Sequence, residues 1–258
     1  MSNHMFLQLS DLHILDRGTL PVGADPLANL DRAIDIIEAS PSRPDGFLLT
    51  GDLADSGTPV AYGLLRDRIE RLSGLSGAPV VVVPGNHDNR AAFQLGLLGS
   101  YGSGRADTPI DQVHWFGGLR VISLDTVVPA CDGGTLRDSQ LRRLQDELST
   151  PARDGTILAM HHPPVSSPIR SMAAMALDNP DRLAAAIEGT DVCLIVAGHN
   201  HHASAGLLGR IPVWVGPALS YSSDALVEDS YTGRRGSAFS RIDVADRQPL
   251  VTVVPVPL

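Results

Sequence analysis

Five short stretches of this sequence carry side chains that bind metal ions or move protons. They read Asp-x-His at 11–13, Gly-Asp at 51–52, Gly-Asn-His-Asp at 85–88, His-His-Pro-Pro at 161–164 and Gly-His-Asn-His-His at 198–202. Only His4 and His114 of the nine histidines lie outside them. Carboxylate, amide and imidazole ligands together suit manganese, iron, zinc or cobalt, whereas magnesium and calcium prefer shells made only of oxygen. Each motif alone is common, but the ordered set favours a metal centre.

Each of these stretches follows a predicted β-strand. The expected strands are short apolar runs at 5–9, 46–50, 79–83, 156–160 and 192–197. Ligands of open α/β sheets bind beyond the carboxyl ends of the strands, so the five loops are expected to converge there. Residues two apart in an extended segment face the same side, and the pairs 11/13 and 199/201 are expected to use this. Glycines at strand exits allow the backbone to approach closely.

The remaining pattern predicts helices and a later group of strands. Apolar residues at helical spacing predict helices at 27–39, 60–72, 138–148 and 181–187, with caps at Thr58 for the second and Asp138 for the third. Further strands are expected at 119–124, 203–208, 211–215, 237–244 and 250–256. The N-terminal part therefore resembles β-α units, and the last third is expected to form antiparallel sheet. Two packed sheets with helices outside satisfy both halves.

Length and charge limit the classes of function. A chain of 258 residues suits one large domain, expected over 1–258. Its apolar runs are shorter than the roughly 20 residues that cross a bilayer, and no apolar signal region follows the N-terminus, so we expect a cytoplasmic protein without membrane insertion. A net charge of −9 and an aromatic content of 4% argue against long nucleic acid as a partner. Cys193 lies in an apolar run and is expected in the core.

In type and order, the five motifs resemble those of the calcineurin-like metallophosphoesterases. The family pattern is Asp-x-His, Gly-Asp, Gly-Asn-His followed by Asp or Glu, a His before x-Pro, and Gly-His-x-His. It spans residues 11–202 here, about three quarters of the chain. The resemblance implies an α/β protein with a four-layer α-β-β-α sandwich, in which two mixed sheets are flanked by helices. It also implies two divalent or mixed-valence metal ions, drawn from manganese, iron, zinc and cobalt.

The resemblance further implies a role for each motif residue. The metal ligands it implies are Asp11, His13 and His201 for one ion, Asn86, His161 and His199 for the other, and Asp52 as the bridge between them. His161 is expected rather than His162, because the family ligand precedes x-Pro.

His87 is not a metal ligand in this family. By resemblance it lies beside the metals and contacts the phosphate, together with Asn86, or the leaving group. It either protonates the leaving oxygen or only hydrogen-bonds the phosphate. Asp88 is expected to orient His87 from behind. Asp52, His87 and Asp88 are thus the expected catalytic residues.

Two interpretations stay open for His162, for His202 and for the loop at 166–179. His162 and His202 flank implied ligands and either touch substrate or pack behind the ligand rings. The loop at 166–179, with Met172 and Met175, either lines a substrate pocket or packs as a helix. His114 lies outside every motif and is expected to be structural.

Details of the motifs narrow the subfamily. Ser56 stands where protein Ser/Thr phosphatases carry Arg, and Asp55 stands where purple acid phosphatases carry a metal-binding Tyr. The stretches at 51–57, 161–164 and 198–202 are more similar to bacterial class III cyclic nucleotide phosphodiesterases and to the related glycerophosphodiesterases.

The expected reaction is hydrolysis of a small phosphodiester by attack of a hydroxide that bridges the two metals. A cyclic nucleotide, either 3′,5′-cyclic AMP or a 2′,3′-cyclic nucleotide, is the preferred substrate hypothesis. The alternative enzyme is a glycerophosphodiesterase or a broad phosphomonoesterase. A metal-binding scaffold for partner proteins, with little turnover, is the hypothesis of another class. The resemblance leaves open a homodimer or a larger homo-oligomer.

Overall fold

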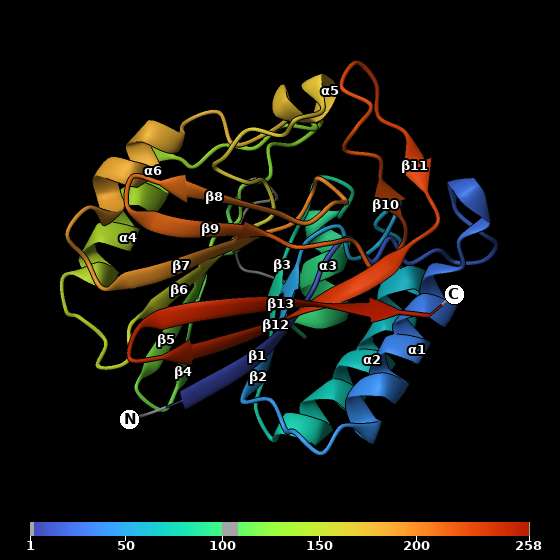
Figure 1. The fold of residues 1–258 in the computed structure, drawn as a ribbon, viewed down its shortest axis with the longest axis horizontal. Helices are drawn as coiled ribbons and strands as arrows, with labels where there is room; N and C mark the ends of the chain where they lie inside the picture. Colours follow the sequence, from blue (N-terminus) through green and yellow to red (C-terminus); the bar gives the residue numbers. More distant parts are fainter. Residues whose placement is uncertain (1–2, 100–107, 258) are drawn as a thin grey trace.

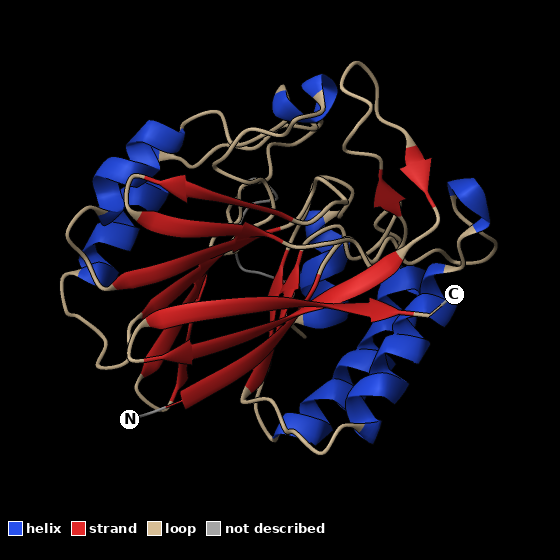
Figure 2. Ribbon diagram, in the orientation of Figure 1, coloured by secondary structure: helices blue, strands red, loops and turns tan. Residues whose placement is uncertain are grey.

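Two large β-sheets pack face to face, and helices cover the outer face of each sheet (Figures 1 and 2). The computed structural model describes residues 3–99 and 108–257. The predicted α/β fold with two mixed sheets flanked by helices is confirmed. Within the described ranges, no helix has both the length and the apolar character that crossing a bilayer requires.

The first sheet has five strands, in the order β13-β12-β1-β2-β3. Its strands are β1 (Asn3–Leu9), β2 (Gly46–Thr50), β3 (Val80–Val83), β12 (Ser237–Ala245) and β13 (Gln248–Val256). β1, β2 and β3 run parallel, and β12 and β13 complete the sheet in antiparallel pairing. Helices α1 (Pro26–Ala39) and α2 (Pro59–Ser76) make the two parallel crossovers.

The second sheet has six strands, in the order β4-β5-β6-β7-β9-β8. They are β4 (Gln112–Phe116), β5 (Leu119–Ser123), β6 (Thr156–Ala159), β7 (Val192–Ala197), β8 (Ser204–Leu208) and β9 (Ile211–Val215). The four central strands are parallel, and β4 and β8 pair antiparallel at the two edges. Helices α4 (Asp138–Leu148) and α6 (Pro180–Ile187) pack against its outer face.

Shorter elements lie in the loops. They are α3 (Arg90–Leu97), α5 (Arg170–Ala173), the 3-10 turn η1 (Pro21–Gly23), and the two-residue strands β10 (Ser222–Ser223) and β11 (Gly233–Arg234). Figure 1 shows α5 beside the loop that joins β10 to β11, where the Arg170 N–H donates to the Glu228 carbonyl at 2.9 Å. This bond joins the segment between β6 and β7 to the segment that leads from the second sheet to β12 of the first.

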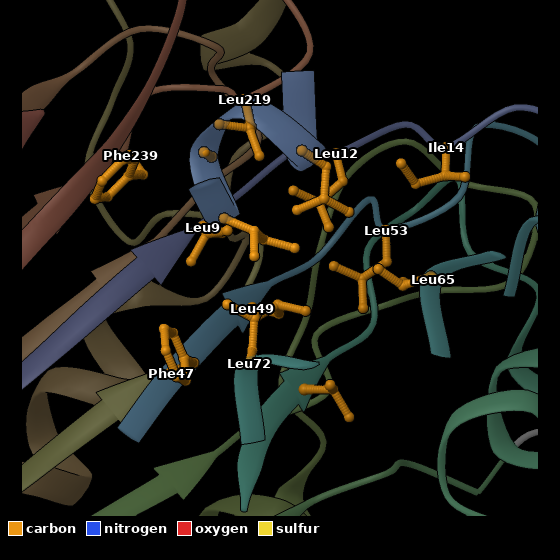
Figure 3. Close-up of a cluster of buried hydrophobic side chains, with 14 of the residues drawn as sticks. Leu9, Leu12, Ile14, Phe47, Leu49, Leu53, Leu65, Leu72, Leu219 and Phe239 are labelled. Carbon is orange, nitrogen blue, oxygen red and sulfur yellow. The ribbon is translucent and has the colours of Figure 1, made fainter. Parts of the chain in front are cut away.

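Apolar side chains fill the spaces between the layers. Between the sheets, Phe6 and Leu48 meet Val121 and Ile157, all fully buried. Between the first sheet and its helices, strand residues such as Leu9, Phe47 and Leu49 face Leu65 and Leu72 of α2 (Figure 3). Because both faces of β2 are covered, all five of its residues are buried. This explains why the parallel strands appear in the sequence as unbroken apolar runs.

Most element boundaries agree with the sequence predictions. Thr58 caps α2, since its hydroxyl accepts the Ala61 N–H at 3.1 Å. Asp138 is not the cap of α4 but its first residue, and the Gln140 side chain accepts the N–H of Arg137 at 3.0 Å instead. Strand β4 and helix α3 were not predicted.

The last third forms antiparallel pairs as expected, β8 with β9 and β12 with β13, and these pairs belong to two different sheets. β12 pairs with β1 of the first sheet, whereas β9 pairs parallel with β7 of the second. Without a partner from the last third, β1 and β7 would each have an edge of unpaired N–H and C=O groups. The C-terminal strands therefore extend both sheets and help to join the two halves.

Candidate metal centre

The loops after β1, β2, β3, β6 and β7 meet at the carboxyl ends of the two sheets. The first two loops run side by side: the Asp11 N–H donates to the Gly51 carbonyl at 3.1 Å, and the His13 N–H donates to the Asp52 carbonyl at 2.8 Å. The loops after β6 and β7 are joined in the same way, by a bond of 3.0 Å from the Gly198 N–H to the His161 carbonyl. All the residues implied as metal ligands are brought together by these contacts.

Left-handed backbone, rather than the expected extended backbone, aims these side chains. Five of the implied ligands have positive φ, namely Asp11 (52°), His13 (47°), Asp52 (49°), His199 (73°) and His201 (56°). Each such residue costs about 1–2 kcal/mol relative to a right-handed conformation. Strain of this kind persists where the surrounding fold enforces it, and it gathers here in the three loops that must point side chains inward.

One group of acceptor atoms surrounds His13 and His201. The two Nε2 atoms lie 3.1 Å apart, with Asp52 Oδ2 3.6 Å from His13 Nε2 and Asp11 Oδ1 3.5 Å from His201 Nε2. The other nitrogen of His201 donates to the Tyr221 carbonyl at 3.0 Å. Burial lowers the pKa of His201 well below its usual value, so its Nε2 carries a lone pair. Lone pairs and carboxylate oxygens that face one another repel unless a positive charge lies between them.

A second group surrounds His161. Its Nε2 lies 3.2 Å from Asn86 Oδ1, 3.3 Å from His199 Nδ1 and 3.3 Å from Asp52 Oδ2, while its Nδ1 donates to the Thr50 carbonyl at 2.9 Å. Burial lowers the pKa of His161, but the Asp52 carboxylate outweighs burial and raises that pKa to about 9. Burial and the charge on His161 lower the pKa of His199 to about 3.

Asp52 faces both groups through one oxygen. Burial alone raises the pKa of this carboxyl, but the imidazoles of His161 and His13 hold it well below its usual range. Asp11 is also buried, and there burial outweighs the same two imidazoles and raises the pKa to about 6. The carboxylate that faces both clusters is therefore charged, as a bridging metal ligand must be.

The spacing of these atoms fits metal coordination. Two ligand atoms bound at about 2.0–2.2 Å, and about 90–110° apart around the ion, lie about 3.0–3.5 Å from each other. The contacts of 3.1–3.6 Å across the two groups agree with that spacing. Imidazole, amide and carboxylate donors also suit the ions expected from the sequence.

Comparison with known proteins agrees with this site. A family model described as calcineurin-like phosphoesterase matches residues 4–203. A probable cyclic nucleotide phosphodiesterase of Rhodococcus erythropolis is 39% identical over 256 residues, 98% of this chain and 84% of the relative. A cAMP/cGMP dual specificity phosphodiesterase of Mycobacterium tuberculosis is 40% identical over 237 residues, 92% of this chain and 74% of the relative. This chain belongs to the calcineurin-like phosphoesterase family.

A solved structure supports the same fold. A dimetal phosphatase from Danio rerio matches with a TM-score of 0.64 at 12% identity, over 98% of this chain and 99% of that protein. The chain is thus an enzyme, a metal-dependent phosphoester hydrolase whose fold implies a dinuclear centre.

His87 stands at the open side of the phosphoesterase centre. Its side chain is 43% exposed, and its ring packs edge to face on His13 with centroids 4.7 Å apart. The His87 backbone N–H donates to Asp52 Oδ1 at 2.9 Å, and its Nδ1 donates to the Asp55 carbonyl at 2.8 Å. The Nε2 side of the ring is left to face solvent or substrate.

The expected contact of Asp88 with His87 is wrong. The Asp88 carboxylate accepts four hydrogen bonds of 2.8–3.1 Å, from the N–H groups of Gly85, Leu53 and Ala54 and from the hydroxyl of Tyr62. Asp88 is only 7% exposed, and none of the partners of its carboxylate is the His87 ring. Its contacts hold the residues that directly follow Asp52, so Asp88 shapes the loop of the bridging carboxylate.

His162 packs behind the implied ligands. Its ring lies 5.0 Å from that of His161 and 4.8 Å from that of His199, close enough to belong to a metal-binding group. Yet Thr126 Oγ1 lies 2.7 Å from its Nδ1, and the Asp132 carbonyl accepts from its Nε2 at 3.1 Å. With both ring nitrogens bonded elsewhere, His162 has no lone pair for a metal, which favours His161 as the ligand.

The other open features are also placed. His202 Nδ1 donates to Ser223 Oγ at 2.7 Å, and Ser223 in turn donates to the Asn200 carbonyl at 2.7 Å. Met172 lies in the single turn of α5 and is only 5% exposed, which favours packing over a pocket lining. His114 lies on β4 beside Gln112, and Cys193 is buried in the core as predicted.

Three groups that hold ligand rings were missed by the sequence reasoning. Two are the backbone carbonyls of Thr50 and Tyr221, which have no sequence signal because every residue has a carbonyl. The third is the carboxylate of Asp55, which lies 3.2 Å from His13 Nδ1, and that hydrogen bond lowers the pKa of Asp55. Its signal was its place three residues after Asp52.

Proposed function

We propose that this phosphoesterase hydrolyses a small phosphodiester, a cyclic nucleotide such as 3′,5′-cyclic AMP before others. The convergence of acceptor atoms around Asp52 carries the proposal, because His13, His161 and His201 all turn their second nitrogen away to a fixed acceptor. Support for a cyclic nucleotide comes from the names of the two bacterial relatives, which align with 98% and 92% of this chain.

The proposed ligands divide between two ions. Asp11, His13 and His201 would hold the first, Asn86, His161 and His199 would hold the second, and Asp52 would serve both. Manganese, iron, zinc or cobalt would suit these donors. When bound, the two ions supply an activated water and stabilise the charge that develops on the phosphate.

The residues of the chain supply orientation and a proton. Asn86 and His87 lie on the open side and contact the phosphate, and the His87 Nε2 gives a proton to the leaving oxygen as the P–O bond breaks. Proton transfer of this kind is typically worth about 10²–10⁴-fold in rate. The backbone bond from His87 to Asp52 keeps this donor close to the bridging carboxylate.

A hydrolysis panel on the manganese-loaded protein tests the proposal. The substrates are 3′,5′-cyclic AMP, 2′,3′-cyclic AMP, a glycerophosphodiester, bis-p-nitrophenyl phosphate and p-nitrophenyl phosphate. Asp52→Ala is the inactive reference, and Asp67→Ala, an exposed aspartate on α2, is the matched control. We expect diester turnover in the wild type and Asp67→Ala, and only background in Asp52→Ala.

The outcome also separates the alternatives. Preference for the glycerophosphodiester or for p-nitrophenyl phosphate would replace the cyclic nucleotide with those substrates. Two bound metal ions without turnover of any ester would contradict the proposal and favour a metal-binding scaffold.

A further inference from the structure

One residue, Asp55, contacts both the implied metal ligand His13 and the implied proton donor His87. Its carboxylate Oδ1 lies 3.2 Å from His13 Nδ1, and its backbone carbonyl accepts from His87 Nδ1 at 2.8 Å. The same carboxylate oxygen is 4.0 Å from His87 Nδ1. The three residues form a compact group in which His13 and His87 also touch each other.

The backbone fixes Asp55 in this position. The Asp55 N–H donates to the Ile14 carbonyl at 3.1 Å, and the Ile14 N–H donates to the Leu53 carbonyl at 3.1 Å. A further bridge pairs Ile14 with Ala54. The loop after β2 is thereby joined to the loop that carries His13, and the Asp55 carbonyl cannot move independently of either.

The two contacts set the ring nitrogens of both histidines. A carboxylate and a carbonyl only accept hydrogen bonds, so the Nδ1 atoms of His13 and His87 both carry hydrogen. His13 is left with Nε2 toward Asp52 and His201, and His87 is left with Nε2 toward the open side. The side chain of Asp55 is itself 28% exposed, so it borders the same opening.

We propose that Asp55 is a positioning residue that couples the His13 ligand to the His87 proton donor, a role that rests on the proposed function. Its carboxylate anchors the segment whose carbonyl holds the His87 ring. In the reaction, water adds to phosphorus, the bond to the leaving oxygen breaks, and the His87 proton moves to that oxygen. The proton lost by the water then replaces, through solvent, the one that left His87 Nε2.

Leaving groups differ in their need for this proton. A ribose alkoxide is a poor leaving group and requires protonation, whereas p-nitrophenolate leaves without it. Loss of the Asp55 anchor should therefore impair cyclic AMP hydrolysis while sparing bis-p-nitrophenyl phosphate. A residue that only maintained the metals or the fold would affect both substrates alike.

The test compares kcat for these two substrates in the manganese-saturated wild type and variants. We expect Asp55→Ala to lower kcat for cyclic AMP about 10–100-fold, with less than about a threefold change for bis-p-nitrophenyl phosphate. Asp55→Asn keeps an oxygen that accepts from His13 Nδ1, so it should recover most of the rate. Asp67→Ala serves as the control. If Asp55→Ala fails to fold, the comparison rests on Asp55→Asn and Asp55→Ser.

A double variant makes the coupling measurable. If Asp55 acts through His87, then Asp55→Ala with His87→Ala should be no slower on cyclic AMP than His87→Ala alone. Multiplicative losses, or equal losses on both substrates with metal release, would overturn the inference while leaving the phosphodiesterase intact. A wild type that hydrolyses neither diester would overturn the proposed function and this role together.

Discussion

Three of the four histidines implied as metal ligands are oriented by a hydrogen bond on their far nitrogen, whereas His199 Nε2 has no such partner among the described residues. Thr50 and Tyr221 offer carbonyls to His161 and His201, and Asp55 offers a carboxylate to His13. Such acceptors fix the ring orientation, so the nitrogens on the opposite side of each ring converge before any metal arrives. The order of the site therefore depends on groups that never touch the ions.

Asp88 gives a prediction at this scale. Asp88→Ala leaves four donors around its carboxylate without a partner, which should lower the free energy of unfolding by about 3 kcal/mol or more. Metal content should fall as well, because the loop after Asp52 loses its support. Urea unfolding and elemental analysis measure the two effects.

The matched variant is Tyr62→Phe, which removes only one of the four donors. It should cost about 1 kcal/mol and keep the metals. Normal stability in Asp88→Ala, combined with a rate loss confined to cyclic AMP, would restore the original expectation that Asp88 orients His87.

The strands contribute to the site because they end beside it, so that the loops that follow them carry the implied ligands. Parallel strands of both sheets deliver five loops to the same side of the molecule, and left-handed turns at Asp11, Asp52 and His199 then redirect the side chains. Glycine at position 51 leaves room for this crowding, since a Cβ there would lie 2.3 Å from His161 Nδ1. The loop after β2 can therefore pass the His161 ring without a clash only because position 51 has no Cβ.

Gly51 and Gly77 separate strain from crowding. Both have positive φ, 89° and 67°, but a Cβ on Gly77 at the end of α2 would meet nothing within 4 Å. Gly77→Ala should lose about 1–2 kcal/mol of stability and keep metals and activity. Gly51→Ala should lose at least as much and also displace His161, with loss of a metal ion. Equal metal content and activity in the two variants would contradict a steric role for Gly51.

At the scale of the whole molecule, the centre is a group of buried, charged side chains at the carboxyl ends of the two sheets. His161 has a pKa of about 9 without metal, so at lower pH it carries a proton that an arriving metal ion must displace. As pH rises toward 9 this competition weakens. Above about 9 it is gone.

Metal affinity should therefore rise with pH. We expect up to about a tenfold gain per pH unit between about pH 7 and pH 9, levelling above that, for one proton released. Titration of the chelated protein with metal ion at several pH values measures the slope. His114→Ala on β4, outside the centre, should keep the same slope. An affinity independent of pH would mean that His161 is not protonated before binding.

The sequence determined the layers and the candidate ligands. Apolar runs predicted the buried parallel strands, since both faces of a strand such as β2 are covered. Residue type and order along the chain predicted which carboxylate, amide and imidazole groups would gather, because each group follows the carboxyl end of a strand. That these strands belong to two sheets rather than one was not predicted. Local signals also sufficed for the cap at Thr58, whose partner is three residues away.

Only the tertiary structure decided the contacts between distant segments. His13 and His201 are 188 residues apart, and nothing local states that their nitrogens face each other. The roles of Asp88 and Asp55 depended on which way each side chain leaves its loop, which is set by neighbours from other strands. The last strands divided between two sheets because open strand edges, rather than their own pattern, determined where they pair. Residue types determined which groups could take part in the chemistry, and packing between distant segments determined where those groups lie.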